Sequence, residues 1–252
     1  MNLSKKIIIG IAIYFVFLVV LIPAKVVMTF IPLPSNVKVA NIDGSLWQGR
    51  ASSIQVMGKA FDQVHWNLNP WALLIGKVSA DITVGSKATS FNTKGHISYS
   101  FSGAQIENLN LGTNADFILA GQRLPFGTKA SGDITLHINE FVQGAPMCEA
   151  LAGKVLLHHV NVNNQFGVFP LGDLAFGLSC EQGEAVLTAK ESDNQLGVSG
   201  TVSIGENNRY KVAAKLKPTK NLPEMIRNNL QYLGQPDSQG YYQINYQGRL
   251  PI

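Results

Sequence analysis

The sequence predicts a mainly β protein, in which an N-terminal transmembrane helix precedes a curved antiparallel β-sheet or sandwich-like domain with one short C-terminal helix. Three observations predict this fold. A long apolar run follows Lys5 and Lys6 at the N-terminus. Many short segments after this run alternate apolar and polar residues, as strands with one buried face do. Long helical stretches that connect parallel strands are missing from the sequence, which disfavours an α/β fold.

The composition fits a folded chain and disfavours several classes of protein. Of the 252 residues, 46% are apolar and only 14% are charged, whereas disordered chains combine high charge with few apolar residues. The formal net charge is +4, and no dense group of basic residues follows the N-terminus. Nucleic-acid binding requires such a group, so we expect no nucleic-acid partner.

The apolar run predicts a membrane anchor. The segment from Ile7 to Ala24 contains no charged residue, and at about 1.5 Å per residue a helix over it would be roughly 27 Å long. The apolar character resumes from Val26 to Ile31. Because positive charges stay on the cytoplasmic side, we expect three parts: a cytoplasmic stub over residues 1–6, a transmembrane anchor over residues 7–31, and a periplasmic β-rich domain over residues 32–252.

Two other interpretations of this run are open. A cleaved signal peptide requires small residues before the cleavage site, and the sequence Ile22-Pro23-Ala24 places a bulky isoleucine at one of these positions. A buried helix of a soluble protein normally keeps one polar face, which this segment lacks. The uncleaved anchor is the favoured interpretation.

Short strands and one helix are predicted after the anchor. Pro32 and Pro34 end the apolar helix, because proline removes an amide donor and restricts the residue before it. A short helix is expected over residues 223–233, with Gly234 after its end, and a brief helical turn over residues 70–75. The alternating segments predict strands within residues 44–56, 61–68, 77–84, 96–101, 105–111, 115–120, 133–139, 184–190, 201–204, 209–217 and 242–246.

A short glycine motif recurs along these segments. It consists of a glycine, any residue and an aliphatic residue, and its intervals are too uneven for a strict structural repeat. Glycine in such a position marks the start of a strand or a β-bulge, where it relieves backbone strain. The glycines concerned are Gly44, Gly95, Gly132, Gly153 and Gly200.

The two cysteines of the chain are Cys148 and Cys180. An even count in an exported domain favours one disulfide, because the compartment outside the cytoplasm is oxidising. Two free buried thiols are the alternative. A zinc site is disfavoured, since the cysteines are far apart in the sequence and form no CxxC pair.

No pattern of residues in the sequence indicates catalysis. The five histidines stand outside the spacings of metal-binding motifs, and nucleotide-binding and nucleophile motifs are missing as well. The neighbours His158 and His159 are expected on opposite faces of a strand. We therefore expect neither enzyme activity nor a cofactor or metal.

Two segments and the cysteine pair resemble a known family. Residues 42–51 contain Gly-Ser-Leu-Trp-Gln-Gly from Gly44 to Gly49. This resembles the Gly-x-Leu-Trp-x-Gly signature near the start of the periplasmic part of the type II secretion system protein N family. Residues 64–70, in which a Trp-containing strand leads into a helical turn, are also similar to this family, as are the two cysteines of the second half.

This resemblance implies a bitopic accessory subunit of the type II, or general, secretion system in the cell inner membrane. It implies partners among the other secretion subunits of that membrane, and contact with membrane lipid through the N-terminal helix. The implied role is to support export of folded periplasmic proteins across the outer membrane by assembly or stabilisation. A more distant similarity to AsmA-like proteins, whose exported regions form curved sheets, implies the alternative of a periplasmic lipid-handling module.

Trp47, Trp66 and Trp71 are the only tryptophans of the chain and lie close together in the sequence. Aromatic residues are enriched at binding hot spots and at membrane interfaces, so these three residues are candidates for contact with a partner. Core packing between the first strands, with each indole N–H satisfied, is the other interpretation.

Overall fold

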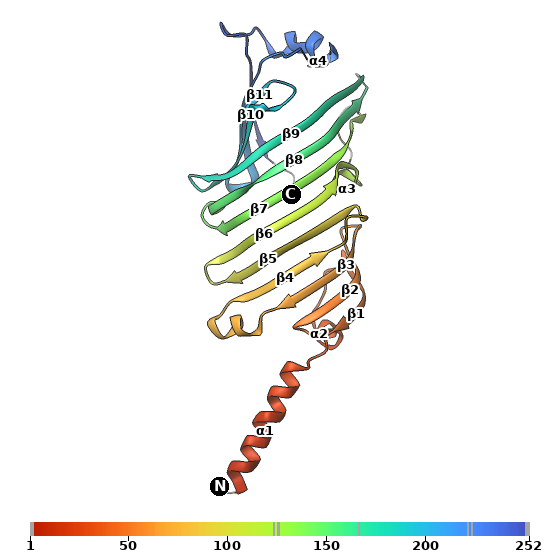
Figure 1. The fold of residues 1–252 in the computed structure, drawn as a ribbon, viewed down its shortest axis with the longest axis vertical. Coiled ribbons are helices and arrows are strands. Elements are labelled where there is room, and N and C mark those ends of the chain that lie inside the picture. Colours follow the sequence, from red (N-terminus) through yellow and green to blue (C-terminus); the bar gives the residue numbers. More distant parts are fainter. Residues whose placement is uncertain are drawn as a thin grey trace.

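In the computed structural model, the described residues are 3–122, 124, 127–165, 167–220, 222 and 224–249. They form one 13-stranded sheet, in which each strand pairs with the strand that follows it in the sequence (Figure 1). The strands are β1 (Val37–Gly44), β2 (Gln48–Val56), β3 (Lys59–Leu68), β4 (Val78–Val84), β5 (Phe91–Ser100), β6 (Gly103–Asn114), β7 (Lys129–Gln143), β8 (Cys148–Asn164), β9 (Gly167–Glu181), β10 (Glu184–Asn194), β11 (Val198–Ile204), β12 (Arg209–Leu216) and β13 (Tyr242–Arg249).

The helices lie mainly at the two ends of this sheet. Figure 1 shows α1 projecting from the β1 end, whereas α4 lies at the opposite end. The helical segments are α1 (Leu3–Val20), α2 (Ala24–Phe30), the 3₁₀ turn η1 (Pro70–Ile75), α3 (Ala115–Leu119), η3 (Glu206–Asn208), α4 (Glu224–Asn229) and η4 (Leu230–Leu233). The α4 and η4 segments cover most of the helix predicted over residues 223–233; Pro223 lies outside the described residues.

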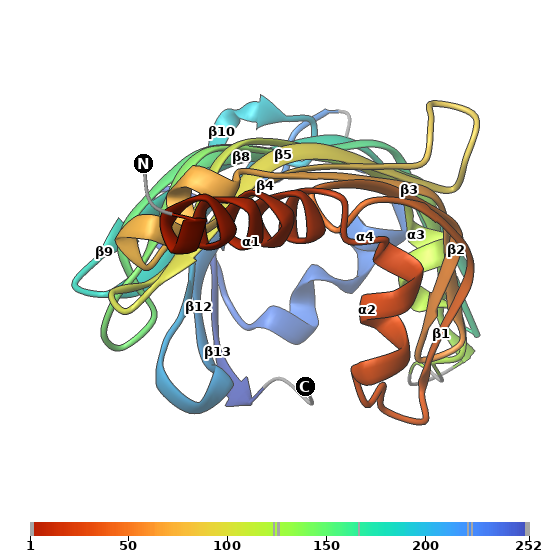
Figure 2. The ribbon, with the colours of Figure 1, turned by 90° about the horizontal axis from the view of Figure 1, so that it is seen from below.

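The prediction of a mainly β, antiparallel fold is confirmed, and a single curved sheet is formed rather than a sandwich. Figure 2 shows that the sheet curves into an open trough, with α2 and α4 on its concave side. All the pairings are between strands that are neighbours in the sequence, so short turns suffice to connect most of them.

The sheet has one apolar and one polar face. Residues that pair directly across neighbouring strands share a face, and the apolar side chains of Leu136, Val155 and Phe176 form such a row across β7, β8 and β9. The next row begins with His137 and Lys154. Because successive residues of a strand point to opposite faces, these polar side chains lie on the other face.

The concave face is the apolar one. Leu222, Ile226 and Leu230, from the segment that lies inside the trough, pack with Leu174 and Leu216 of the sheet (Figure 2). Leu174 stands two positions before Phe176 on β9 and so belongs to the apolar face. The sheet therefore turns its apolar side chains toward the inside of the trough.

Two clusters of buried apolar side chains lie at the two ends of the trough. One buried cluster lies beside α4 and contains Leu196, Leu216, Leu222 and Leu230. The other lies on β2, β3 and β4 and contains Ala51, Val64 and Val84. Between these clusters, the apolar side chains of the concave face, such as Leu136 and Val155, are only half-buried. The middle of the trough therefore has an apolar floor that remains open.

Bulges bend the strands. Asn108 in β6 and His159 in β8 have positive φ angles of 51° and 52° and lie at shifts of the pairing register. Asn41 in β1 and Gln63 in β3 also have positive φ angles, of 47° and 53°, but the register continues unchanged past them. The predicted motif glycines contribute: Gly95 and Gly132 lie at shifts of the pairing register, whereas Gly153 and Gly200 stand where an added Cβ would overlap the neighbouring strand. Bulges increase local twist and bend a strand, so the register shifts between β5 and β6 and from β7 to β10 contribute to the curvature of the sheet.

The N-terminal segment differs from the continuous helix predicted over residues 7–31. α1 ends at Val20 and α2 begins at Ala24. Pro23, between them, forms an isolated bridge with Ser45, and proline has no amide with which to continue the helical hydrogen bonds. In the described part of the chain, no helix is both long and apolar enough to cross a membrane. Met1 and Asn2 of the predicted stub lie outside the described residues.

The strand predicted over residues 115–120 is wrong, because this segment forms the helix α3. The side chain of Asn114 accepts a hydrogen bond of 2.8 Å from the backbone N–H of Phe117 and caps the first turn. The ring of Phe117 packs against Phe61 and Phe91, with centroids 5.6 Å from each. The cap and this aromatic packing outweigh the alternating pattern.

The predicted disulfide joins Cys148, at the start of β8, to Cys180, near the end of β9, with Cα atoms 6.1 Å apart. Cys148 is fully buried. Both strands lie outside the predicted strand segments, because bulges such as the one at His159 interrupt their alternation. The disulfide therefore fastens two long strands near the middle of the meander.

Replacing both cysteines, in Cys148→Ala/Cys180→Ala, is expected to destabilise the folded sheet. The bond spans a sequence separation of 32 residues, and the chain-entropy cost of such a loop corresponds to roughly 3.5 kcal/mol. Thermal unfolding followed by circular dichroism in detergent measures the effect, and the reduced wild-type chain serves as a second sample. Equal melting temperatures for all three samples would contradict a stabilising role.

Candidate functional site

The candidate site is the turn between β1 and β2, which joins the sheet to α1. The turn closes where Gly44 pairs with Gly49. The backbone N–H of Ser45 donates to the carbonyl of Gln48 at 2.9 Å, and the N–H of Gln48 donates to Ser45 Oγ at 3.0 Å. Gly44 has φ of +89°, and an added Cβ would lie 2.5 Å from the Gln48 carbonyl oxygen. Glycine is therefore required at this first position of the family signature.

The turn caps the C-terminal end of α1. The backbone N–H of Leu46 donates to the carbonyl of Ile22 at 2.9 Å, and Trp47 Nε1 donates to the carbonyl of Val19 at 3.0 Å. The Val19 carbonyl, in the last turn of α1, also accepts from the backbone N–H of Ile22 at 3.4 Å, and Ile22 lies just after the helix. The two donors of the turn therefore bind the end of α1 and the residues that follow it. The turn thus fixes where α1 leaves the sheet.

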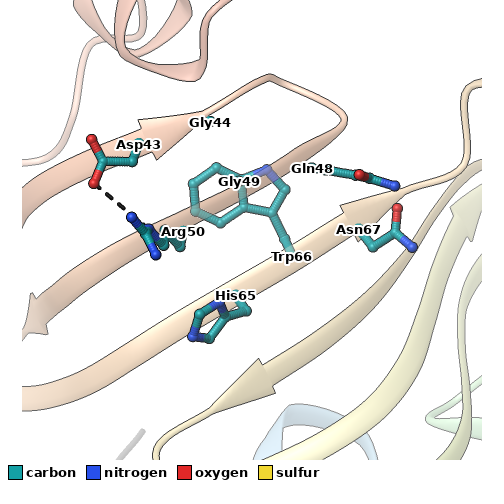
Figure 3. A pocket seen from close by; sticks show the side chains of 8 residues that line it. All are labelled: Asp43, Gly44, Gln48, Gly49, Arg50, His65, Trp66 and Asn67. Atoms are coloured by element: carbon teal, nitrogen blue, oxygen red, sulfur yellow. Dashed lines mark ion pairs between the residues drawn. The ribbon is translucent and has the colours of Figure 1, made fainter.

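Trp66 on β3 packs against the turn. Its Nε1 donates to the carbonyl of Leu46 at 3.0 Å, and its ring lies across Gly49 (Figure 3). A Cβ at Gly49 would overlap the Cζ2 atom of this ring. The second glycine of the signature is therefore required for close contact with an aromatic ring, and the signature describes one packed unit.

An open cavity of about 440 Å³ lies over this unit, and Figure 3 shows the residues that line it. Arg50 Nε and Asp43 Oδ2 are 3.6 Å apart at its edge, and both side chains are exposed. An exposed ion pair of this kind contributes little to stability. In the described residues, no group of three or more His, Cys, Asp and Glu side chains is placed to hold a metal ion.

A second cavity, of about 760 Å³, separates the end of α1 from the η1 turn. Its apolar lining comes from Val19 and Val20 of α1, from Trp47, and from Leu73 and Leu74 of η1. The cavity shows that η1 lies beside the point where α1 meets the sheet.

The structure separates the three tryptophans into two environments. Trp47 and Trp66 are half-buried and both use their indole N–H in the junction, as the packing interpretation expects. Trp71 on η1 is exposed. Sequence reasoning missed the role of Gly49, although the spacing of the signature marks it, and missed the carbonyls of Val19 and Ile22, which leave no trace in the sequence.

The histidine neighbours depart from the prediction. His158 Nδ1 lies 3.6 Å from Asp173 Oδ2, and the backbone N–H of His159 donates to Asp173 Oδ1 at 2.9 Å. The two rings are 6.5 Å apart between centroids, so opposite faces are wrong, because the bulge at His159 breaks the alternation. The His159 N–H and, to a lesser extent, His158 lower the pKa of the exposed Asp173 carboxyl.

Comparison with known proteins identifies the family. Residues 35–245 match the sequence model described as "Type II secretion system (T2SS), protein N". The chain belongs to the type II secretion system protein N family. This confirms the family predicted from the signature, and the matched residues include the whole β1–β2 turn with its supporting Trp66.

The relatives that the chain matches include proteins named type II secretion system protein N from three species. The protein from Aeromonas hydrophila is 31% identical over 241 residues, which are 94% of each chain. The protein from Vibrio cholerae serotype O1 is 29% identical over 233 residues, 92% of each chain. The protein from Pectobacterium carotovorum subsp. carotovorum is 25% identical over 253 residues, 99% of this chain and 100% of the relative. No solved structure matches significantly.

In this member of the type II secretion system protein N family, Gly49→Ala is expected to loosen the junction. The added methyl group overlaps the Trp66 ring, and overpacking of this kind costs about 1–3 kcal/mol. Thermal unfolding and tryptophan fluorescence measure the loss. The matched control is Gly177→Ala on β9, where an added Cβ meets no atom within 4 Å. Equal stability of the two variants would contradict the packed junction.

Proposed function

We propose that this chain is a non-catalytic accessory subunit of the type II secretion system, which assembles or stabilises that machinery in the cell inner membrane. In this role it supports export of folded periplasmic proteins across the outer membrane. The observation that carries the proposal is membership of the family over residues 35–245, which include nearly the whole sheet. The junction adds to it, because it couples the N-terminal segment firmly to the sheet.

The N-terminal segment supports a membrane location. Apolar side chains such as Ile8, Ile11 and Phe17 are exposed along α1, and α1 projects away from the sheet (Figure 1). A helix with apolar side chains on all sides is suited to an apolar surrounding. We place the whole segment of residues 7–31 at the inner membrane as a single-pass anchor, with Lys5 and Lys6 on the cytoplasmic side and the sheet in the periplasm.

The sheet offers surfaces for partners. β1 and β13 are the end strands of the described sheet, so each has one edge without a neighbouring strand in it. Such an edge accepts an added strand through backbone hydrogen bonds. We propose that other secretion subunits of the inner membrane bind the sheet, and that Trp71 is the tryptophan available for contact outside the chain, since Trp47 and Trp66 serve the junction.

The open trough favours a second candidate function, a periplasmic lipid-handling module. The concave face carries apolar side chains such as Leu136, Val155 and Phe176, and these are half-buried rather than enclosed in a core. Acyl chains are a suitable ligand for an extended apolar surface of this kind. In this function the sheet shields lipid from water along the trough.

Deleting the gene for this chain is expected to reduce secretion, so that proteins exported by the pathway accumulate in the periplasm. The wild-type chain and the Gly177→Ala control are expected to restore secretion and to co-purify with inner-membrane secretion subunits in mild detergent. A chain in which a cleavable signal peptide replaces residues 1–31 is expected to lose both properties. Normal secretion in the deletion strain, with no secretion subunit recovered, would contradict the proposal.

For the lipid-handling candidate, Val155→Asp is expected to reduce the phospholipid that stays bound after detergent exchange, because it places a charge on the apolar face. Lys154→Asp is the matched control, since the neighbouring residue lies on the polar face. Mass spectrometry of extracted lipid measures the difference. If the wild-type chain retains no more lipid than its isolated N-terminal segment, this candidate is wrong.

A further inference from the structure

An exposed apolar patch lies on the η1 turn. Trp71, Leu74 and Ile75 are 76%, 78% and 79% exposed, and Phe101 from the β5–β6 turn is fully exposed. Phe101 lies against the end of η1, because an added Cβ at Gly76 would be 3.1 Å from its ring. We call these four side chains the η1 tip. Contiguous exposed apolar side chains on a folded protein mark an interaction surface.

The η1 tip is held outward by a well-formed turn. At its start, the Asn69 side chain accepts a hydrogen bond of 3.0 Å from the N–H of Trp71. At its end, Gly76 adopts a left-handed conformation, with φ of 71°, and its N–H donates to the carbonyl of Leu73 at 3.0 Å. Ala72, inside the turn, is buried. The exposure of the tip is therefore a property of the fold and is already in place before anything binds.

The η1 tip lies where α1 leaves the sheet. Leu74 lines the same cavity as Val19 and Val20 in the last turn of α1. Figure 1 shows the orange η1 turn, between β3 and β4, at the end of the sheet from which α1 projects. Figure 2, seen from that end, shows η1 on one side of α1 and α2 on the other. Phe30 of α2 is exposed as well.

The charge around the η1 tip suits a phospholipid surface. From Asn69 to Ala80 the only charged residue is Lys77, which is half-buried and donates to Gln105 Oε1 at 3.0 Å. On α2, Lys25 is exposed. The next residue, Asp81, is acidic and lines the same cavity as Leu74, where its carboxylate is 2.8 Å from His96 Nδ1. An aromatic residue beside aliphatic residues and a lysine is the composition that favours the boundary between headgroups and acyl chains.

We propose that the η1 tip is a second membrane contact. Trp71, Leu74, Ile75 and Phe101 insert into the headgroup region of the leaflet from which α1 emerges, and this inference rests on the proposed membrane anchorage of residues 7–31. With α1 as the only contact, the helix can tilt in the bilayer and carry the sheet with it. Contact at both α1 and the η1 tip fixes the tilt, so that the trough has a set orientation relative to the bilayer.

Nitroxide labels on the full-length chain in nanodiscs of phosphatidylethanolamine and phosphatidylglycerol test the proposal. The native cysteines are joined in a disulfide, so a single added cysteine takes the label. Leu74→Cys reports on the η1 tip, Ile11→Cys reports on α1, and Val168→Cys on β9 is the matched control, because Val168 is an exposed apolar residue away from α1. Power saturation compares collisions of each label with oxygen and with a water-soluble nickel chelate.

We expect the Leu74 and Ile11 labels to collide more with oxygen than with nickel, and the Val168 label to show the reverse. Nickel access at Leu74 equal to that at Val168, with Ile11 protected, would overturn the second contact and leave the anchor intact. Nickel access at both Leu74 and Ile11 would overturn the anchorage itself. Because Leu74 is exposed, its substitution leaves the fold intact, which circular dichroism verifies.

A second measurement uses the native tryptophan. Brominated phospholipids in the nanodisc are expected to quench part of the tryptophan emission, and Trp71→Phe is expected to remove most of that quenchable part. Trp47 and Trp66, which are half-buried in the junction, supply the remaining emission. Quenching that is unchanged in Trp71→Phe would count against insertion of the tip. A Leu74 label protected only when secretion subunits are added would assign the patch to a protein partner and overturn the lipid contact.

Discussion

The hydrogen bonds from the β1–β2 turn to the carbonyls of Val19, in the last turn of α1, and Ile22, just after it, are the constraint on which the rest of the structure depends. A helix end that projects from a sheet has unpaired carbonyls and no fixed direction. Leu46 and Trp47 donate to the carbonyls of Ile22 and Val19 and so fix the direction of the helix end, and Trp66 holds Leu46 in place. The helix and the first hairpin are thereby one unit. The position of α1 is thus coupled through hydrogen bonds to the first three strands.

Unlike the tightly bonded junction, most of the sheet encloses few side chains. Its two buried clusters lie at the ends, beside α4 and on β2 to β4, and the middle is held mainly by strand pairing and by the disulfide between β8 and β9. Bulges in several strands turn this ladder into a trough. The fold therefore has a buried cluster at each end and an open apolar concave face between them. This arrangement suits a sheet that is anchored at one end and binds other molecules along its concave face.

Much of the architecture can be predicted from the sequence, because alternation survives in many strands. Residues 133–139 and 184–190 lie within the longer strands β7 and β10, and residues 209–217 match β12 except for the last residue. It fails where a local contact dominates. Asn114 caps a helix where alternation predicts a strand, and the bulge at His159 hides β8. Proline at position 23 divides a run that composition alone describes as continuous.

The candidate site likewise contains contacts that the sequence indicates and contacts that it does not. Glycine and tryptophan in the signature are visible in the sequence because side-chain size is what their contact requires, as at Gly49 under Trp66. The partners of Leu46 and Trp47 are backbone carbonyls, and any residue supplies a carbonyl. Their role is therefore fixed by the path of the chain and becomes visible only in three dimensions.

The order of the strands has a consequence for how the chain reaches its fold. Every strand of the described sheet pairs with its neighbour in the sequence, and contacts between near neighbours form quickly because little loop entropy is lost. A chain that emerges from its N-terminus can therefore form one hairpin after another, with each new strand pairing to the strand before it. No strand edge has to stay unpaired until a strand distant in the sequence arrives. The meander can therefore fold while the chain is still emerging.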